Sequence, residues 1–122
     1  MKREANFQTT FNHYLKSVHK KTGAFELKQT KTNSIAFDLV VPHQEQALLN
    51  VKNGTFVYKI PDMGFQNPFD CFCMVSEDAF VVIKYPDFFC MIDINDWVQE
   101  KKISGRKSLT STRAKEIATV IV

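Results

Sequence analysis

The sequence of 122 residues lacks any apolar run that is long enough to cross a membrane. Its longest apolar runs, such as residues 79–83, have the length of a strand, whereas a membrane-spanning helix needs about 20 apolar residues. The polar stretch that follows Met1 contains no apolar signal core. We therefore expect a cytoplasmic protein with no membrane partner.

Cysteine is also scarce. Cys71, Cys73 and Cys90 are odd in number and show no Cys-x-x-Cys spacing. They stand in apolar, strand-like runs, where a free thiol packs as a small hydrophobic group. The three histidines do not complete the four-ligand spacing of a zinc site. We expect free thiols in a reducing compartment and no structural zinc.

Acidic residues are few at both ends of the chain. Residues 1–31 contain seven Lys or Arg and two acidic residues, and residues 101–122 contain six and one. Residues 32–100 contain three basic and ten acidic residues, so the three parts contribute +5, −7 and +5 to the net charge of +3. Basic ends are typical of a protein that binds a polyanion, and an acidic middle is typical of one that binds cations. An ordinary solvated surface gives the same charge pattern.

Hydrophobic residues make up 44% of the chain and include eleven Phe, which is enough to fill the interior of one domain. Apolar residues between Phe7 and Val18 recur at helical spacing, which predicts a first helix with Asn6 as its cap. Pro42 in a first turn and Gly54 just past a last turn predict a second helix, with the bounds 42–52.

Strand patterns fill most of the remaining sequence. Residues 101–107 are interpreted as a basic linker, and Thr110 as the cap of a last helix over residues 111–121. The element order predicts an α/β domain, bordering on α+β, with a central mixed β-sheet flanked by helices over residues 1–122 and a basic C-terminal segment 101–122. The predicted strands are residues 24–30, 55–60, 69–75, 79–85 and 88–94, with residues 35–40 as a short strand or extended segment.

Glu26 and Lys28 form the pair of greatest chemical interest. Alternate residues of a strand point to one face, so Glu26 and Lys28 would project together while Phe25 and Leu27 enter a core. Metal-assisted phosphodiester cleavage needs a carboxylate that binds a divalent cation and a lysine that orients water and offsets phosphate charge. The same triplet is common as a surface ion pair, so alone it does not define a function.

The stretch from Glu26 to Gln44 resembles the PD-(D/E)xK nuclease superfamily, and within it the Holliday junction resolvases of the RecU and archaeal Hjc type. The likeness rests on Glu26 and Lys28 on a strand, a polar segment, and His43 followed by Gln44 at the start of a helix. The Gly-Arg-Lys-Ser segment at residues 105–108 is similar to a basic segment near the end of RecU-like chains. Further segments resemble phage-borne resolvase-like proteins: residues 59–62, 68–72 and 79–86.

The resemblance implies a restriction-endonuclease-like core and a metal-dependent endonuclease that acts on branched DNA in recombination. It implies Glu26 as the metal-binding carboxylate, Lys28 as the catalytic lysine and Gln44 as a supporting residue, with Mg²⁺ or Mn²⁺ as cofactor. Symmetric cutting of a four-way junction needs two active sites, which implies a homodimer. The compartment would be the cytoplasm of a prokaryotic cell or of a phage's host.

One departure from the superfamily concerns the second metal-binding carboxylate. The superfamily carries an Asp on the strand before Glu-x-Lys, but residues 1–25 contain one acidic residue, Glu4, and no Asp. We therefore expect Asp70 to complete the metal site with Glu26, with Asp62 as the second choice. The alternative function is a catalytically inactive, nuclease-fold protein that binds DNA or another partner.

Simpler structural roles stay open for several of these residues. Asp70 lies two positions after Pro68 and also fits a turn residue that bonds its own backbone. Gln44 also fits a helix cap or a bond to a neighbouring loop, and His43 fits a polar residue at a helix start. A small interaction module whose acidic middle contacts a basic partner is a third function class.

Basic residues at both ends of the chain are the candidates for contact with the DNA backbone. Contacts to phosphates give affinity that depends strongly on salt and little on base sequence. No segment resembles a base-reading helix, so recognition would rest on the shape of the DNA. The predicted DNA-binding residues are Lys16, Lys20, Lys21, Lys31, Arg106 and Lys107.

Overall fold

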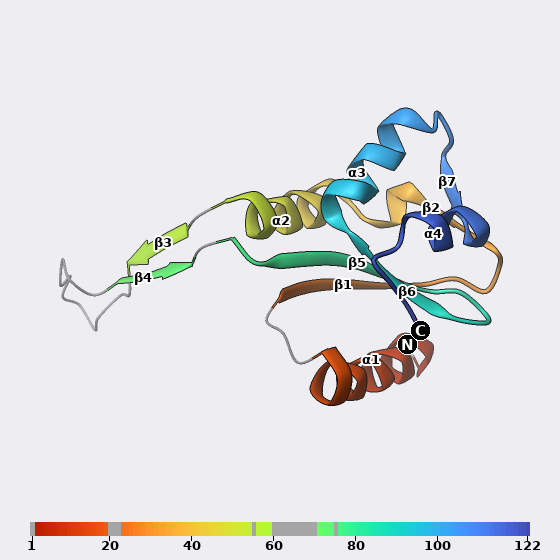
Figure 1. Cartoon of the computed structure of the whole chain (residues 1–122), viewed down its shortest axis with the longest axis horizontal. Helices are drawn as coiled ribbons and strands as arrows, with labels where there is room; N and C mark the ends of the chain where they lie inside the picture. The colour runs from red at the N-terminus through yellow and green to blue at the C-terminus, as the bar shows by residue number, and fades with distance from the viewer. Residues whose placement is uncertain (1, 20–22, 55, 60–70, 75) are drawn as a thin grey trace.

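The computed structural model describes residues 2–19, 23–54, 56–59, 71–74 and 76–122 (Figure 1). Within these residues, four α-helices pack around one mixed sheet with the strand order β1-β5-β6-β8. Two further strand pairs, β2 with β7 and β3 with β4, lie outside this sheet. The predicted α/β class, with a central mixed sheet flanked by helices, is confirmed.

The central sheet joins segments from both halves of the chain. Strand β1 is parallel to β5, whereas β6 is antiparallel to β5 and β8 is antiparallel to β6. A parallel pair requires a long crossover connection, and here the connection from β1 to β5 includes helix α2. The bounds are β1 (Gly23–Gln29), β5 (Asp78–Lys84), β6 (Phe89–Asp93) and β8 (Val120–Ile121).

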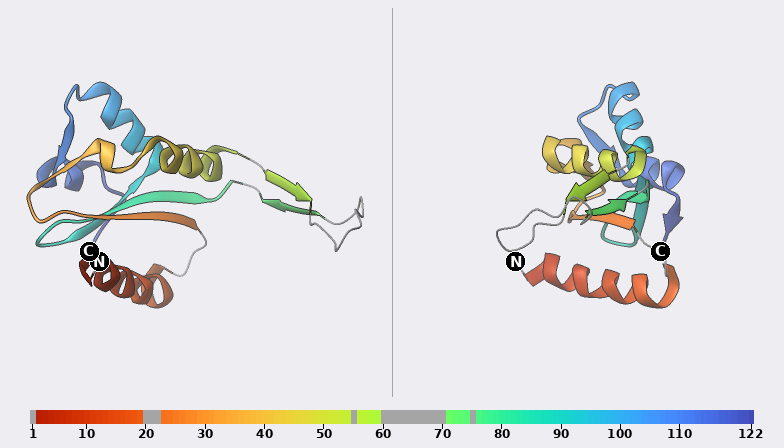
Figure 2. Two further views of the ribbon diagram at one scale, coloured as in Figure 1. Left: turned by 180° about the vertical axis from the view of Figure 1, so that it is seen from behind. Right: turned by 90° about the vertical axis from the view of Figure 1, so that its left-hand side faces the viewer.

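Helix α1 (Lys2–Tyr14) covers one face of the sheet and continues as a π-helical turn (Leu15–His19) (Figure 2). Phe7 and Phe11 are four positions apart, so they lie on the same side of the helix, and both are buried. An aromatic cluster therefore fixes α1 to this face. Its other buried members are Phe80, Val82, Phe89 and Met91.

Three helices and a 3-10 turn cover the opposite face of the sheet (Figure 2). Trp97 is fully buried in this layer and packs edge-on against Phe37, with 5.0 Å between the ring centroids. Cys90 lies in the same core, where burial raises the pKa of its thiol to about 12 and makes it a packing residue. The bounds are α2 (Pro42–Asn53), α3 (Ile94–Ile103), α4 (Ser111–Ile117) and the turn (Phe37–Leu39).

The start of the first helix differs from the prediction. Helix α1 begins at Lys2, and the Thr10 hydroxyl donates a hydrogen bond to the Asn6 carbonyl at 3.1 Å, so Asn6 lies inside the helix. The prediction of Asn6 as the cap was wrong. Residues 2–5 are Lys, Arg, Glu and Ala, which are good helix formers and extend the helix past a cap-like residue.

Helix α3 was not predicted. Its cap is Asp93, whose carboxylate accepts a hydrogen bond from the Asn95 backbone at 2.9 Å, directly at the end of β6. The interpretation of residues 101–107 as a linker was therefore wrong in part. Lys101 and Lys102 belong to the last turn of α3, where cations interact favourably with the helix dipole.

The last helix is shorter than predicted. Thr110 caps it as expected, because its hydroxyl accepts a hydrogen bond from the Arg113 backbone at 3.3 Å. The helix ends at Ile117 because Thr119 then donates a backbone hydrogen bond to Met91, which begins the pairing of β8 with β6. The segment predicted as residues 35–40 forms β2 (Ser34–Ala36) and the 3-10 turn.

Strands β3 (Phe56–Lys59) and β4 (Cys71–Met74) form a separate antiparallel ribbon. We call these two strands the arm, because they project away from the central sheet (Figures 1 and 2). The arm confirms the two predicted strands over the described positions. At its base, the Glu77 backbone donates a hydrogen bond to the Val51 carbonyl of α2 at 2.9 Å.

Candidate functional site

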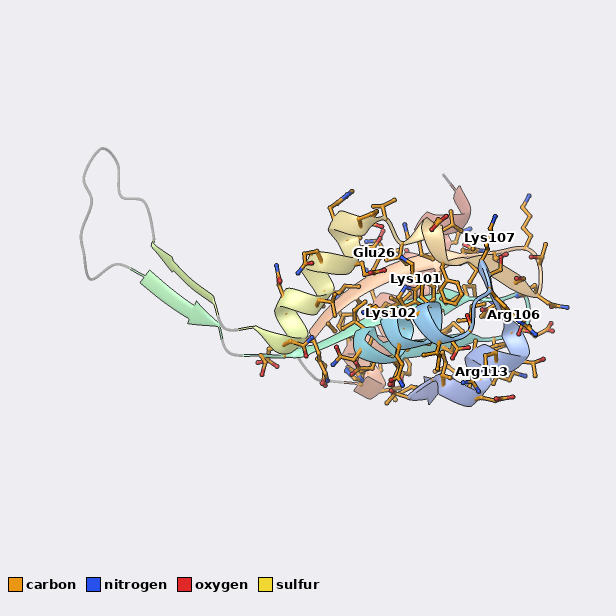
Figure 3. The ribbon with its side chains drawn as sticks, turned by 90° about the horizontal axis from the view of Figure 1, so that it is seen from above. Glu26, Lys101, Lys102, Arg106, Lys107 and Arg113 are labelled. Atoms are coloured by element: carbon orange, nitrogen blue, oxygen red, sulfur yellow. The ribbon has the colours of Figure 1, made fainter. Side chains whose placement is uncertain are left out.

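Glu26 and Lys28 lie together on β1, as the strand alternation predicts. Their Oε1 and Nζ atoms are 3.4 Å apart, and their side chains are 28% and 19% exposed. Phe25 and Leu27 pack into the aromatic cluster under α1, so Glu26 and Lys28 face the side of the sheet that α2 and α3 cover. Figure 3 looks onto this side and labels Glu26. The pair is half-buried, which distinguishes it from a fully solvated surface pair.

Gln44 occupies the third position of helix α2, on the same side of the sheet. Its side-chain oxygen accepts a hydrogen bond from the Val41 backbone at 3.2 Å, and its own backbone donates one to the Val41 carbonyl at 3.0 Å. The amide oxygen of Gln44 thus satisfies a backbone donor at the helix start. The neighbouring His43 is exposed.

The second carboxylate of the predicted metal site, Asp70 or Asp62, lies outside the described residues. In the described part of the chain, no group of three or more His, Cys, Asp or Glu side chains is placed to hold a metal ion. Glu26 supplies one hard oxygen ligand, which suits Mg²⁺ or Mn²⁺. A complete site at Glu26 would need further ligands from residues beyond those described, from water or from the substrate.

A second ion pair lies in the same layer. Lys101 Nζ on α3 is 3.2 Å from Glu45 Oε2 on α2, and this contact ties the two helices together above the sheet. Figure 3 labels Lys101 on the side of the sheet from which Glu26 is seen. The sequence did not indicate this contact, because Lys101 was assigned to a linker.

Lys52 forms a charged cluster that the sequence interpretation missed. Its Nζ is 2.8 Å from Asp93 Oδ2 and 3.4 Å from Asp78 Oδ1. The hydrogen bond to Asp93 is the main cause that raises the pKa of Lys52, with a smaller contribution from Asp78. Strand β5 begins where β6 ends, so the two aspartates meet at one end of the sheet. Lys52 fixes the end of α2 to that sheet end.

Arg113 and Glu100 form a two-point ion pair between α4 and α3. The distances are 2.9 Å from Nε to Oε2 and 3.0 Å from Nη2 to Oε1, and the Glu100 side chain is only 8% exposed. The hydrogen bonds from Arg113 hold the pKa of Glu100 below its ordinary value, and Arg106 contributes a smaller effect of the same sign. The pair borders a cavity of about 380 Å³ whose lining also includes Ile103, Ser104, Arg106, Ser108, Leu109 and Thr110.

Arg113→Ala is expected to lower the melting temperature at pH 7, because it leaves the buried Glu100 carboxylate without its partner. The folded-state pKa of Glu100 is depressed, so this stabilisation is present above the ordinary carboxyl pKa of about 4.3 and is lost as the pH falls. Thermal unfolding from pH 7 to pH 3 should show the wild type and the variant converging in acid.

Glu116→Gln is the matched control for this prediction, because it removes only the contact between Arg113 Nη1 and the 57% exposed Glu116. An exposed pair contributes little, so this variant should stay close to the wild type at every pH. A melting-temperature difference between Arg113→Ala and the wild type that is unchanged in acid would contradict the assigned role of Glu100.

The predicted DNA-binding residues do not form one surface. Lys16 is exposed on the π-helical turn beside α1, whereas Arg106 and Lys107 are exposed in the loop after α3, on the other side of the sheet. Strand β2 pairs with β7 (Ser108–Thr110), which brings the segment that follows the exposed Lys31 alongside the basic loop. Lys20 and Lys21 lie outside the described residues.

The surface around the basic loop is more extensive than the sequence indicated. Figure 3 labels basic side chains on α3, on the loop that follows it and on α4. Lys101 and Lys102 were not among the predicted DNA-binding residues. They lie in the last turn of helix α3, which places them next to the loop. The labelled basic residues are Lys101, Lys102, Arg106, Lys107 and Arg113, and we call them the basic surface.

No protein-family model, curated protein or solved structure matches this chain. The sheet and its helices define the chain as a mixed α/β protein. Among the residues that the structure describes, no helix is both long and apolar enough to cross a membrane.

Proposed function

We propose that the protein is a metal-dependent endonuclease that acts on branched DNA, with Glu26 and Lys28 as its catalytic pair. The observation that carries the proposal is the 3.4 Å contact between their charged atoms on a half-buried strand face. A carboxylate that can bind a divalent cation, with an ammonium group beside it that can offset phosphate charge, is part of what metal-assisted phosphodiester hydrolysis needs from the protein.

The mixed α/β architecture is consistent with this proposal. The resemblance to PD-(D/E)xK nucleases implies a mixed sheet with helices on both faces. The four-stranded sheet has α1 on one face and the other three helices on the opposite face, in agreement with that expectation. The strand that contains Glu26 is followed by a helix that begins near Gln44, as the resemblance also implies.

In the proposed reaction, Glu26 would hold the divalent cation, which would supply an activated water and offset charge on the scissile phosphate. The ammonium group of Lys28, which lies beside Glu26, would orient the attacking water and donate hydrogen bonds to the phosphate. Asp70 is the proposed second carboxylate, with Asp62 as its alternate.

The basic surface supports a DNA substrate. Lys102, Arg106 and Lys107 are exposed. The other two members are ion-paired, Lys101 with Glu45 and Arg113 with Glu100 and Glu116. Cations grouped in this way bind backbone phosphates with little regard to base sequence. A junction bound through its phosphates would be recognised by its shape, as a branched-DNA nuclease requires.

The first test incubates the purified protein with labelled four-way junction, flap and linear duplex DNA, in Mg²⁺, in Mn²⁺ and in EDTA. We expect cleavage of the junction with either metal and none with EDTA. Raising the salt concentration should weaken DNA binding steeply, because phosphate contacts release counterions. Absence of cleavage with every DNA and both metals would refute the nuclease proposal.

A second candidate function is DNA binding without catalysis. It is favoured by the lack, within the described residues, of any group of three or more potential metal ligands. The same assay separates the two functions. A junction that is shifted in a gel or in fluorescence anisotropy but never cut would establish the binding function instead.

A further inference from the structure

The arm is a two-stranded sheet that is separate from the central sheet. Its strands pair with each other in a sheet of their own and project from the body of the protein (Figures 1 and 2). An isolated two-stranded hairpin is at best marginally stable in water, and it needs more strands or a packing partner. Among the described residues, no third strand extends this ribbon, so a further strand or surface would stabilise it.

The sequence of the arm gives both faces of the ribbon an apolar character. The pairing places Phe56 opposite Met74 and Tyr58 opposite Phe72, so these four positions share one face. Positions 57, 59, 71 and 73 share the other face. Seven of the eight residues are apolar, and Lys59 is the exception. A solvated ribbon normally keeps one face polar, so this pattern predicts an interface.

The central sheet has an edge that could receive such a ribbon. Strand β1 is the first strand in the sheet order, and all seven of its residues are half-buried, whereas the five middle residues of β5 are buried. The Thr30 backbone donates to the Lys84 carbonyl at 3.0 Å, so even-numbered residues direct their backbone groups toward β5. Phe25, Leu27 and Gln29 therefore direct theirs outward, where no strand of the described residues pairs with them.

We propose that the arm of one copy of this chain adds to the outer edge of β1 in a second copy, and that the exchange is reciprocal. Each chain contains both halves of the contact: an apolar two-stranded ribbon and a sheet edge with which no described strand pairs. An added strand would form backbone hydrogen bonds with the outward N–H and C=O groups of β1. Because the exchange is reciprocal, the two chains would form a closed dimer with two-fold symmetry.

The size of the contact supports a reciprocal exchange between two copies. A large aromatic residue buries about 150–250 Å², and each arm contains three: Phe56, Tyr58 and Phe72. Two arms together then bury on the order of 1,000 Å², which is near the lower limit of a specific interface. One arm alone would bury about half of this area and would form a weaker contact.

Light scattering after size exclusion tests the proposal. We expect the wild type to have twice the 14.1 kDa mass of one chain. The arm variant Tyr58→Ser/Phe72→Ser and the edge variant Gln29→Pro should each shift to the mass of one chain. Proline at position 29 removes an outward N–H and no hydrogen bond of the β1–β5 pair, so the fold is kept. Gln29→Ala keeps that N–H and should remain dimeric.

Mixing the two variants gives the sharpest test. The edge variant still has an intact arm and the arm variant still has an intact β1 edge, so an equimolar mixture should form a heterodimer through one arm–edge contact. A heterodimer from the mixture, weaker than the wild-type dimer because it has one contact, would support the exchange. A monomeric wild type, or an edge variant that remains dimeric, would overturn it. Circular dichroism confirms that each variant is folded.

This inference is independent of nuclease activity, because its readout is mass and needs no DNA. A monomeric protein that cuts junctions would overturn the exchange alone. If the two variants form a heterodimer when mixed but the wild type never cuts DNA, the arm exchange is supported and only the catalytic proposal is refuted.

Discussion

Glu26→Gln is expected to reduce cleavage of four-way junction DNA by at least about 100-fold, the size of effect seen when one charge-stabilising group is removed from an active site. The amide is a poorer ligand for a hard divalent cation, so the loss should appear in the cleavage rate. Lys28→Met should reduce the rate to a similar degree, because it removes the group that orients water and offsets phosphate charge. Single-turnover cleavage with excess enzyme measures both effects.

Asp38→Asn is the matched control for the catalytic pair. Asp38 is an exposed carboxylate in the 3-10 turn on the same side of the sheet. Its removal should leave the cleavage rate near that of the wild type. Junction affinity should also persist in Glu26→Gln, since the substitution removes a negative charge. Equal activity of the wild type, Glu26→Gln and Lys28→Met would show that another site performs the reaction.

Trp97→Ala is expected to destabilise the fold by about 3–5 kcal/mol, the range for removal of a large buried aromatic residue. Trp97 has no exposed surface, and it holds α3 against the sheet and the Phe37 ring. The melting temperature should fall by roughly 10–20 °C. Thermal unfolding followed by circular dichroism is the appropriate measurement, because Trp97 is the only tryptophan of the chain.

Trp97→Phe separates ring packing from hydrogen bonding at this position. Within the described residues, the buried indole nitrogen of Trp97 has no hydrogen-bond partner, so a phenyl ring in its place loses no hydrogen bond there. The cost should stay below about 2 kcal/mol. A loss as large as that of the alanine variant would mean that the indole nitrogen has an essential partner.

The helices and strands with strong local signals were predictable. Pro42 and Gly54 define helix α2, and the apolar runs before and after Pro86 become β5 and β6. Helix α3 was missed because its start, Asp93, directly follows an apolar strand. Strand β8 has only two residues and depends on hydrogen bonds to β6, so its own sequence contains no strand pattern.

The candidate site was predictable where it depends on strand alternation and unpredictable where it depends on distant contacts. Alternation alone placed Glu26 and Lys28 on one face. The ion pairs of Lys52 with Asp78 and Asp93 join residues that are separated in sequence and meet only through the strand register. Local composition contains no information about such a register, because several alignments bury the same apolar residues.

The parallel pairing of β1 with β5 has a consequence for how the chain folds and varies. Each residue of β1 pairs with the residue 55 positions later, as Gly23 does with Asp78. Neighbouring strands β5 and β6 and helix α3 can assemble locally, whereas β1 must wait for the whole intervening segment. The entropy of closing that loop grows by only about 0.6 kcal/mol for each doubling of its length. The arm lies within this segment, so a change in the arm's length would cost little in the pairing of β1 with β5.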